Sequence, residues 1–143
     1  ETLKEMENVL GVSLPRVINE AITERDYGDY TGKNKWEVKK QLGDEEFLKL
    51  RRSWDYYVPH GESLKDVYSR AVPYYQQNIL PQLKEGKNVL VSAHGNSLRA
   101  LVKFLDNIPD NKIAELEIPT GQVLVYSVDQ DGKIVSKEIR GAI

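Results

Sequence analysis

Residues 88–105, NVLVSAHGNSLRALVKFL, constrain the fold of this chain more than any other stretch. An almost wholly apolar run, Val89–Ala93, ends at His94, and a helical pattern begins directly after it. An apolar run without alternation is typical of a strand that is covered on both faces, as in a parallel sheet between helices. The apolar residues that follow recur at helical spacing: Leu98, Leu101, Val102 and Leu105. The stretch therefore predicts a buried strand followed by a helix, which is the building unit of an α/β fold.

Further helices and an antiparallel hairpin are predicted along the rest of the chain. We expect helices over residues 3–10, 36–42, 44–54 and 64–83, and a short one from 110. We expect strands over 17–22, 89–93, 123–128 and 134–139, the last two joined by the turn sequence DQDG. Pro73 and Pro81 interrupt the longest helical pattern, so a kink near 73 and fraying at 81 are expected. This order predicts one α/β domain, residues 1–143, with a mixed sheet.

The composition excludes several classes of protein. The length of 143 residues is that of one ordinary domain, and 40% hydrophobic residues suffice for a packed core. The formal net charge of −2 gives no reason to expect a nucleic-acid partner. The chain has no cysteine, which excludes disulfides and thiolate metal sites, and no apolar run approaches the length of a membrane span. We therefore expect a cytoplasmic protein with neither a membrane nor a nucleic acid as partner.

His94, one of two histidines, stands at the carboxyl end of the predicted strand, where α/β folds bind ligands. Gly95 lets a ligand approach the backbone closely, and Asn96 or Ser97 can cap the helix that follows. The first amides of that helix have no partners within it and carry the positive end of its dipole, which suits a phosphate group. The sequence thus predicts an imidazole beside an anion site; the alternative is a structural histidine at a strand end.

Three cationic residues could add positive charge to such an anion site. Arg51 and Arg52 are adjacent, and arginine forks match phosphate oxygens in shape and charge. Lys35 could contribute a third cation. For the two arginines the alternative is a solvated basic patch, and for the lysine it is a solvated side chain.

A carboxylate with suitable neighbours occurs in the segment ERDYGDYTGKNK, residues 24–35. Glu24 and Arg25 open this glycine-rich loop, and Tyr27 follows them. A carboxylate close to a bound phosphate and several cations could transfer protons. The alternative is an ion pair at the surface.

Five segments together resemble one enzyme family. They are ITERDYGDYTGKNK, LRRSWD, ESLKDV, ILPQLKEGKNVLVSAHGNSLRALVKFLDN and ELEIPTGQVLVY, in this order and over nearly the whole chain. The chain is similar to the cofactor-dependent phosphoglycerate mutases of the histidine phosphatase superfamily, and its short link between RRSWD and ESLKD resembles their compact form. The resemblance implies an α/β three-layer sandwich, with a mixed, mostly parallel sheet and helices on both faces.

The resemblance also implies a reaction, the interconversion of 3-phosphoglycerate and 2-phosphoglycerate in glycolysis and gluconeogenesis. A phosphohistidine donates its phosphoryl group to the substrate, and 2,3-bisphosphoglycerate serves as primer and intermediate. No metal is implied, because arginines, histidine and helix-terminal amides supply the positive charge. Phosphoglycerates are the expected small-molecule partners, and the choice between a homodimer and a tetramer stays open.

The family's functional residues can be carried over where the motifs match. His94 matches the second active-site histidine, which hydrogen-bonds the transferring phosphoryl group. Glu24 matches the general acid and base that handles the proton of the substrate hydroxyl. The positions that match phosphate- and carboxylate-binding residues are Arg25, Tyr27, Lys35, Arg51, Arg52, Gly95 and Asn96.

One departure from the family pattern concerns the nucleophile, which the family carries in an Arg-His-Gly motif on a first strand. This sequence has no such motif. The segment HGES at 60–63 is similar to it, but Pro59 stands in place of the arginine, so we expect His60 to be an exposed loop histidine. The resemblance implies a strand and a helix upstream of Glu1, so we expect an N-terminally incomplete domain that is inactive alone. The alternatives are a phosphatase of the same superfamily and a non-catalytic fragment that binds anions.

Overall fold

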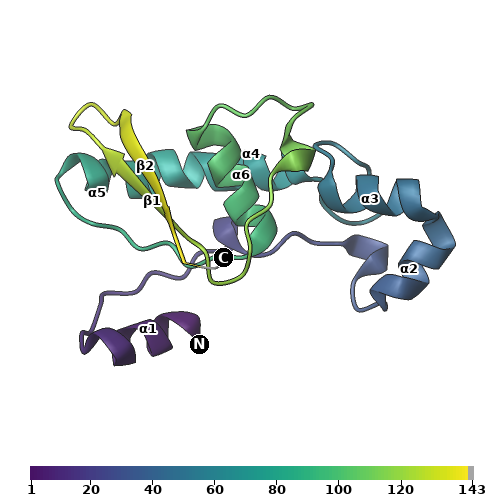
Figure 1. The fold of residues 1–143 in the computed structure, drawn as a ribbon, viewed down its shortest axis with the longest axis horizontal. Coiled ribbons are helices and arrows are strands. Elements are labelled where there is room, and N and C mark those ends of the chain that lie inside the picture. Colours follow the sequence, from purple (N-terminus) through teal and green to yellow (C-terminus); the bar gives the residue numbers. More distant parts are fainter. Residues whose placement is uncertain (142–143) are drawn as a thin grey trace.

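The computed structural model describes residues 1–141 (Figure 1). Its helices and strands, with η for short 3₁₀ or π turns, are α1 (Thr2–Leu10), η1 (Glu20–Ile22), η2 (Gly28–Tyr30), α2 (Lys35–Leu42), α3 (Asp44–Arg52), α4 (Leu64–Tyr74), η3 (Tyr75–Ile79), α5 (Leu80–Lys84), α6 (Gly95–Leu105), η4 (Ile113–Glu115), β1 (Val123–Val128) and β2 (Ile134–Arg140). Within these residues, no helix combines the length and the apolar character that a membrane crossing requires.

The helices α1, α2, α3 and α6 begin and end close to the positions that the sequence predicts, and these predictions are confirmed. Gly11 caps the end of α1, and its φ of +65° is a left-handed conformation that favours glycine. α2 begins after Asn34, whose side chain accepts a hydrogen bond of 2.9 Å from the backbone N–H of Trp36. α3 ends at Arg52, earlier than expected, and its first residue is Asp44. The short helix expected from 110 is the single 3₁₀ turn η4.

The predicted helix over 64–83 exists as a continuous run of α4, η3 and α5, but its hydrogen bonding changes midway. Pro73 lies inside α4 and has no N–H to donate, and the π turn η3 follows directly after this helix. A π turn is one way in which a helix absorbs an irregular hydrogen-bond pattern. The structure thus has a π turn directly after the helix that contains Pro73, where the sequence predicts a kink. The fraying expected at Pro81 is wrong, because α5 continues through it to Lys84.

The centre of the core lies between α4 and α6, which pack against each other (Figure 1). Leu64, Val67, Ala100 and Ile113 form a cluster without solvent exposure at this contact. Burying an aliphatic side chain of this kind stabilises a fold by roughly 1.5–3 kcal/mol. This packing fixes α6 and therefore the direction in which its first turn points.

The sheet within residues 1–141 is the hairpin of β1 and β2, whose antiparallel register pairs Val123 with Arg140 and Tyr126 with Lys137. The predicted hairpin is confirmed. The strands expected over 17–22 and 89–93 are wrong: the first segment ends in the 3₁₀ turn η1, and the second forms no regular secondary structure. A strand needs a hydrogen-bonded neighbour, and among the described residues no backbone pair bonds to segment 88–93. The mixed, mostly parallel sheet is therefore absent from residues 1–141.

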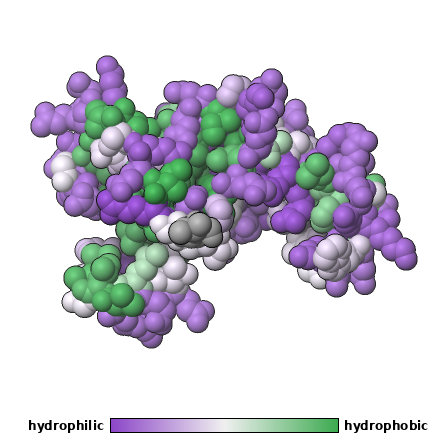
Figure 2. Space-filling view, in the orientation of Figure 1, coloured by the Kyte–Doolittle hydropathy of each residue, from purple (hydrophilic) through white to green (hydrophobic). Residues whose placement is uncertain are grey.

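The N-terminal arm, residues 1–19, lies beside the core rather than within it (Figure 1). α1 has no buried residue. Val9, Leu10, Val17 and Ile18 are exposed, and Figure 2 shows apolar surface over this helix. The arm thus contributes little to the packing that positions the rest of the chain.

Candidate active site

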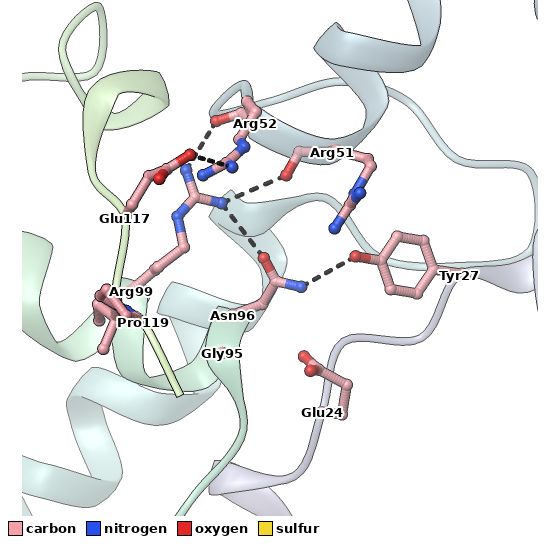
Figure 3. Close-up of a pocket in the computed structure, with 10 residues that line it drawn as sticks. Glu24, Tyr27, Arg51, Arg52, Gly95, Asn96, Arg99, Glu117 and Pro119 are labelled. Atoms are coloured by element: carbon pink, nitrogen blue, oxygen red, sulfur yellow. Dashed lines mark hydrogen bonds and ion pairs between the residues drawn. The ribbon is translucent and has the colours of Figure 1, made fainter. Parts of the chain in front are cut away.

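A pocket of about 350 Å³ lies where four parts of the chain meet (Figure 3). They are segment 24–27, the last turn of α3, the first turn of α6 and segment 117–119. The lining residues are Glu24, Tyr27, Arg51, Arg52, Gly95, Asn96, Arg99, Glu117, Ile118 and Pro119. This volume is within the range of small-molecule sites. Six residues predicted for one site therefore lie around one pocket.

The first turn of α6 forms one wall, and Gly95 and Asn96 line the pocket from it. His94 is the N-cap residue, with extended backbone (φ −96°, ψ 166°). The buried Ser97 hydroxyl accepts from the His94 N–H at 3.2 Å and donates to the His94 carbonyl at 3.0 Å. The His94 side chain is exposed and is not among the lining groups, although its neighbour Gly95 is. Its predicted contact with a phosphoryl group stays a prediction.

The last turn of α3 forms the opposite wall and brings both adjacent arginines to the pocket. The Arg51 guanidinium lies 5.9 Å from the centre of the Phe47 ring and points toward Tyr27 (Figure 3). The Arg52 guanidinium forms an ion pair with Glu117 across the pocket edge. The end of α3 thus places both arginines at one pocket, and their binding of a single anion stays a prediction.

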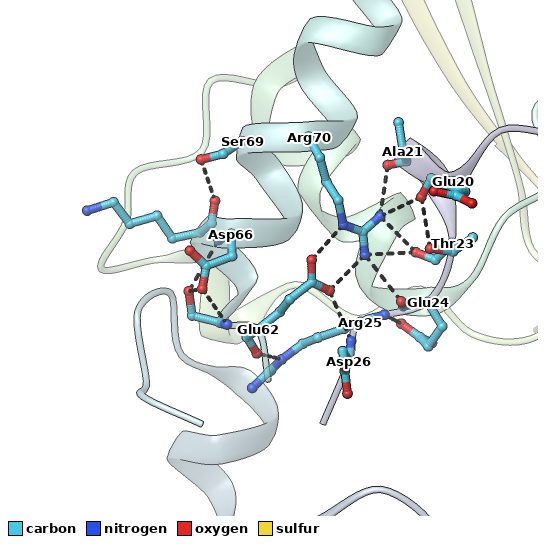
Figure 4. A network of polar contacts seen from close by, with 12 residues as sticks. Glu20, Ala21, Thr23, Glu24, Arg25, Asp26, Glu62, Asp66, Ser69 and Arg70 are labelled. Carbon is cyan, nitrogen blue, oxygen red and sulfur yellow. Dashed lines mark hydrogen bonds and ion pairs between the residues drawn. The ribbon is translucent and has the colours of Figure 1, made fainter. Parts of the chain in front are cut away.

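Glu24 and Tyr27 approach from the third side, and a separate polar cluster holds this segment in place (Figure 4). The Glu24 carboxylate accepts a hydrogen bond of 2.8 Å from the backbone N–H of Arg25. Arg70 from α4 donates to the Glu24 carbonyl at 3.2 Å and to the Glu62 carboxylate at 2.7 and 2.9 Å. The same guanidinium also donates to the carbonyls of Glu20, Ala21 and Thr23. Arg70 therefore fixes the backbone from which Glu24 projects.

Arg25 is buried next to the pocket rather than lining it, with 3% of its surface exposed. Its guanidinium lies 4.8 Å from the centre of the Tyr27 ring and donates to the carbonyls of Glu62 and Leu50. Among the described residues, its Nη2 is a buried nitrogen without a hydrogen-bond partner. Burial lowers the pKa of Arg25 below its usual range. A buried cation with an unused donor is the kind of group that an anion stabilises.

Two residues singled out in the sequence lie away from the pocket. Lys35 is the first residue of α2, is exposed, and extends over the Trp36 ring at 5.2 Å, so the structure does not bring it to the other cations. His60 is exposed on a loop, as predicted, and its Nδ1 lies 2.9 Å from an Asp29 carboxylate oxygen. It has a φ of +56° in a loop that touches Gly28 closely.

Arg99 and Glu117 line the pocket but were missed in the sequence. Arg99 is 5% exposed, and burial together with the nearby Arg52 charge lowers its pKa to about 10. The sequence feature that could have indicated Arg99 is the helical spacing of Asn96, Arg99 and Lys103. This spacing places three polar side chains along one face of α6. Such a stripe normally indicates a solvated face, whereas all three residues here are buried.

The charges around the pocket favour an anion. Three arginines and two carboxylates line it, and the buried Arg25 adds a further cation beside it. Within residues 1–141, no group of three or more His, Cys, Asp or Glu side chains could hold a metal ion. The arrangement can bind phosphate or carboxylate groups through guanidinium, amide and phenol donors, and Glu24 offers a carboxylate for proton transfer.

Comparisons with known proteins agree on the family. The histidine phosphatase superfamily (branch 1) matches residues 1–138. The chain is 48% identical to the 2,3-bisphosphoglycerate-dependent phosphoglycerate mutase of Methylorubrum populi, over 94% of this chain and 63% of that protein. It is 44% identical to the phosphoglycerate mutase of Schizosaccharomyces pombe, over 94% of this chain and 64% of that protein. The chain thus spans less than two thirds of the length of these relatives.

Solved structures share the fold at lower identity. A mycobacterial glucosyl-3-phosphoglycerate phosphatase superimposes with a TM-score of 0.70 at 19% identity, over 97% of this chain and 69% of that one. A protein described as mycobacterial hydrolase 1 gives a TM-score of 0.64 at 20% identity, over 81% and 57% of the two chains. These likenesses and the family match confirm the predicted α/β, phosphoglycerate mutase-like fold class. The chain is a member of the histidine phosphatase superfamily, branch 1.

Proposed function

We propose that this chain carries the substrate-binding and proton-transfer groups of a 2,3-bisphosphoglycerate-dependent phosphoglycerate mutase, which interconverts 3-phosphoglycerate and 2-phosphoglycerate. The observation that carries the proposal is the pocket that Glu24, Arg51, Arg52 and Asn96 share. It is supported by relatives of that name at nearly half identity over most of this chain.

The pocket residues fit phosphoglycerates and 2,3-bisphosphoglycerate, which carry phosphate and carboxylate groups on a short carbon chain. Arg51 and Arg52 would hold one phosphate with their forked donors, and the first amides of α6 would hold another anionic group. The unpartnered Nη2 of Arg25 is a further donor beside the pocket. When bound, 2,3-bisphosphoglycerate supplies the phosphoryl group that primes the reaction cycle.

Two residues would handle protons and developing charge. Glu24 would accept the proton of the substrate hydroxyl and later return it, because it lines the same pocket as Asn96 (Figure 3). His94, at the N-terminus of the same α6 that presents Asn96, would donate a hydrogen bond to the phosphoryl oxygens. The 143 residues contain no Arg-His-Gly motif, so the decisive test on this chain is ligand binding rather than turnover.

The test is calorimetric titration of the chain with 3-phosphoglycerate and with glycerate, which lacks the phosphate. We expect 3-phosphoglycerate to bind and glycerate to bind at least tenfold more weakly. Arg51→Ala should weaken 3-phosphoglycerate about tenfold, because a charge-assisted hydrogen bond contributes roughly 1.5–3 kcal/mol. The matched control is Lys49→Ala, which removes a cation from the same helix where it pairs with Glu45 and Glu46 instead of lining the pocket. Equal affinities for both ligands, or an unchanged affinity in Arg51→Ala, would overturn the proposal.

A phosphatase of the same superfamily is the less supported function. The solved structures with a phosphatase or hydrolase name share only 19% and 20% identity with this chain, which supports the fold alone. The relatives at 44–50% identity carry the mutase name.

A further inference from the structure

Arg99 is the most completely hydrogen-bonded side chain at the pocket. Its five contacts are Nε to the Leu116 carbonyl (3.2 Å), Nη1 to the Arg51 carbonyl (3.4 Å) and to Asn96 Oδ1 (3.2 Å), and Nη2 to the carbonyls of Arg52 (2.9 Å) and Ile113 (2.8 Å). A guanidinium has five N–H donors, so these five acceptors occupy all of them. Arg99 therefore has no donor left for a ligand, although it lines the pocket.

Two of these acceptors belong to the end of α3. The last carbonyls of a helix have no partner within it, and those of Arg51 and Arg52 are of this kind. Arg99 donates to both, which ties the last turn of α3 to α6 (Figure 3). The backbone positions of Arg51 and Arg52 are thereby fixed, and their side chains project into the pocket from an anchored turn.

A third acceptor determines which way the Asn96 amide faces. Arginine can only donate, so the atom of Asn96 that meets Arg99 must be the carbonyl oxygen. The Asn96 NH₂ group then donates to the Tyr27 hydroxyl at 3.0 Å, as Figure 3 shows. Because this hydroxyl oxygen accepts from Asn96, its own hydrogen stays available to the pocket. Arg99 thus fixes the orientation of the Asn96 amide, and this orientation in turn directs the hydrogen of the Tyr27 hydroxyl toward the pocket.

We propose that Arg99 is a positioning residue for anion binding: it acts through Asn96, Tyr27 and the end of α3 and does not touch the ligand. The inference rests on the proposed function only in that the pocket binds a phosphoglycerate. Burial lowers the pKa of Arg99 to about 10, so the guanidinium keeps its charge and all five donors at neutral pH.

The first test compares Arg99→Lys with the parent chain in calorimetric titrations with 3-phosphoglycerate. Lysine keeps the charge but has three donors without the planar fork, so it cannot hold the α3 carbonyls and Asn96 together. We expect about tenfold weaker binding. The control is Leu101→Ala in the same helix, which removes buried contacts with Ala71, Tyr75 and Ile79 on another face. It should lower stability while leaving the affinity within twofold of the parent.

A double-mutant cycle with Asn96→Ala separates positioning from direct contact. If Arg99 acts through Asn96, Arg99→Lys should cost at most threefold in the Asn96→Ala background, against tenfold in the parent. No loss in the parent would contradict the inference, and the same tenfold loss in both backgrounds would contradict the route through Asn96 and Tyr27. If the parent binds 3-phosphoglycerate and Arg51→Ala weakens it while Arg99→Lys does not, the inference fails and the proposed function stands. Failure of the parent to bind overturns both.

Tyr27→Phe tests the orientation of the Asn96 amide without disturbing the buried arginine, so it serves even if the Arg99 variant does not fold. With Arg99 setting the amide, the Tyr27 hydrogen faces the ligand, and its removal should weaken 3-phosphoglycerate about threefold to tenfold. With the opposite amide orientation, the Tyr27 hydroxyl would donate to Asn96 and have no hydrogen for the ligand. An unchanged affinity in Tyr27→Phe therefore overturns the inference.

Discussion

Two arginines, Arg99 and Arg70, hold different sides of the candidate pocket by different chemistry (Figures 3 and 4). The Arg99 wall is the first turn of α6 together with the end of α3, and the Arg70 wall is the segment that carries Glu24. Arg99 joins α6 to the end of α3 and donates only to uncharged carbonyl and amide oxygens. Arg70 fixes the segment that carries Glu24, and its guanidinium also forms a two-pronged ion pair with Glu62. Arg99 is 5% exposed, whereas the Arg70 side chain is 24% exposed.

This difference indicates which wall a bound anion would stabilise. Glu62 neutralises Arg70, and each holds the other charged: the pKa of Arg70 is raised and that of Glu62 is lowered. Arg99 has no carboxylate among its hydrogen-bond partners, so the cost of burying its charge remains, and its pKa is lowered. An anion in the pocket would offset that cost. The charge of Arg70 is thus balanced by Glu62 within the chain, whereas an anionic ligand would stabilise the buried charge of Arg99.

The largest expected effect is on the stability of the chain when either guanidinium is removed. Arg99→Met should lower the free energy of unfolding by about 3 kcal/mol or more, because it leaves five buried or partly buried acceptors without their donors. Arg70→Met should cost about 1–2 kcal/mol, since water can reach part of that cluster. Urea denaturation followed by circular dichroism measures both. The reverse order of the two losses would break the contrast between the walls.

A smaller effect is expected in the acid range and concerns only the Arg70 wall. The hydrogen bonds from Arg70 lower the pKa of folded Glu62 below its unfolded value, so the unfolded chain takes up this proton first as pH falls. The stability from the pair is therefore complete above the unfolded pKa and is lost as pH falls through the folded one. Glu62→Gln should be about 1 kcal/mol less stable at pH 7, and the difference should shrink as pH falls below the unfolded pKa of Glu62.

The control for this titration is Arg99→Met, whose loss should stay constant between pH 7 and pH 3. None of the five oxygens that accept from Arg99 belongs to a group that titrates there. Urea midpoints at several pH values give both curves. A loss for Arg99→Met that shrinks as strongly as that of Glu62→Gln would show that the walls do not differ as described.

Sequence patterns located the helices and the hairpin because these elements hydrogen-bond within a short stretch. α6 and the β1–β2 hairpin have caps, turns and apolar periods that are visible locally. A strand is different, because its pairing partner decides whether it forms. Val89–Ala93 has the composition of a buried strand, yet residues 1–141 provide no neighbour that bonds to it. The apolar pattern therefore predicted a strand that these residues do not form.

Site residues could be predicted from the sequence where the chemistry of the side chain indicates its role. They could not be predicted where the role depends on groups that the fold brings next to the side chain. Arg51 and Arg52 look like phosphate ligands in sequence, and both line the pocket. Arg99 looks like a solvated helix residue, and only the carbonyls that surround it, from α3 and η4, make it a central group. Lys35 has the same chemistry as the others but follows Asn34 at the start of an outlying helix, so its charge stays away from the pocket.

The smallest expected effect on stability concerns Glu117, which pairs with Arg52 on the Arg99 side of the pocket. The Glu117 side chain is 68% exposed, so Glu117→Gln should change the free energy of unfolding by less than about 0.5 kcal/mol. The same change should strengthen 3-phosphoglycerate binding about twofold to threefold, because the Arg52 guanidinium no longer has to break its ion pair with Glu117 to bind the ligand. The gain should shrink in 1 M salt, where the Debye length is about 3 Å.

The matched control is Glu115→Gln, two residues away, where the carboxylate is 70% exposed and pairs with Lys112 instead of lining the pocket. It removes the same formal charge from the same segment, so a general change in the field of the chain would appear equally in both variants. Binding that improves only in Glu117→Gln assigns the effect to the Arg52 pair. Two outcomes would contradict this prediction: binding that improves equally in both variants, and binding that weakens in Glu117→Gln. Either one would mean that the Arg52 guanidinium does not bind the ligand from the Arg99 wall.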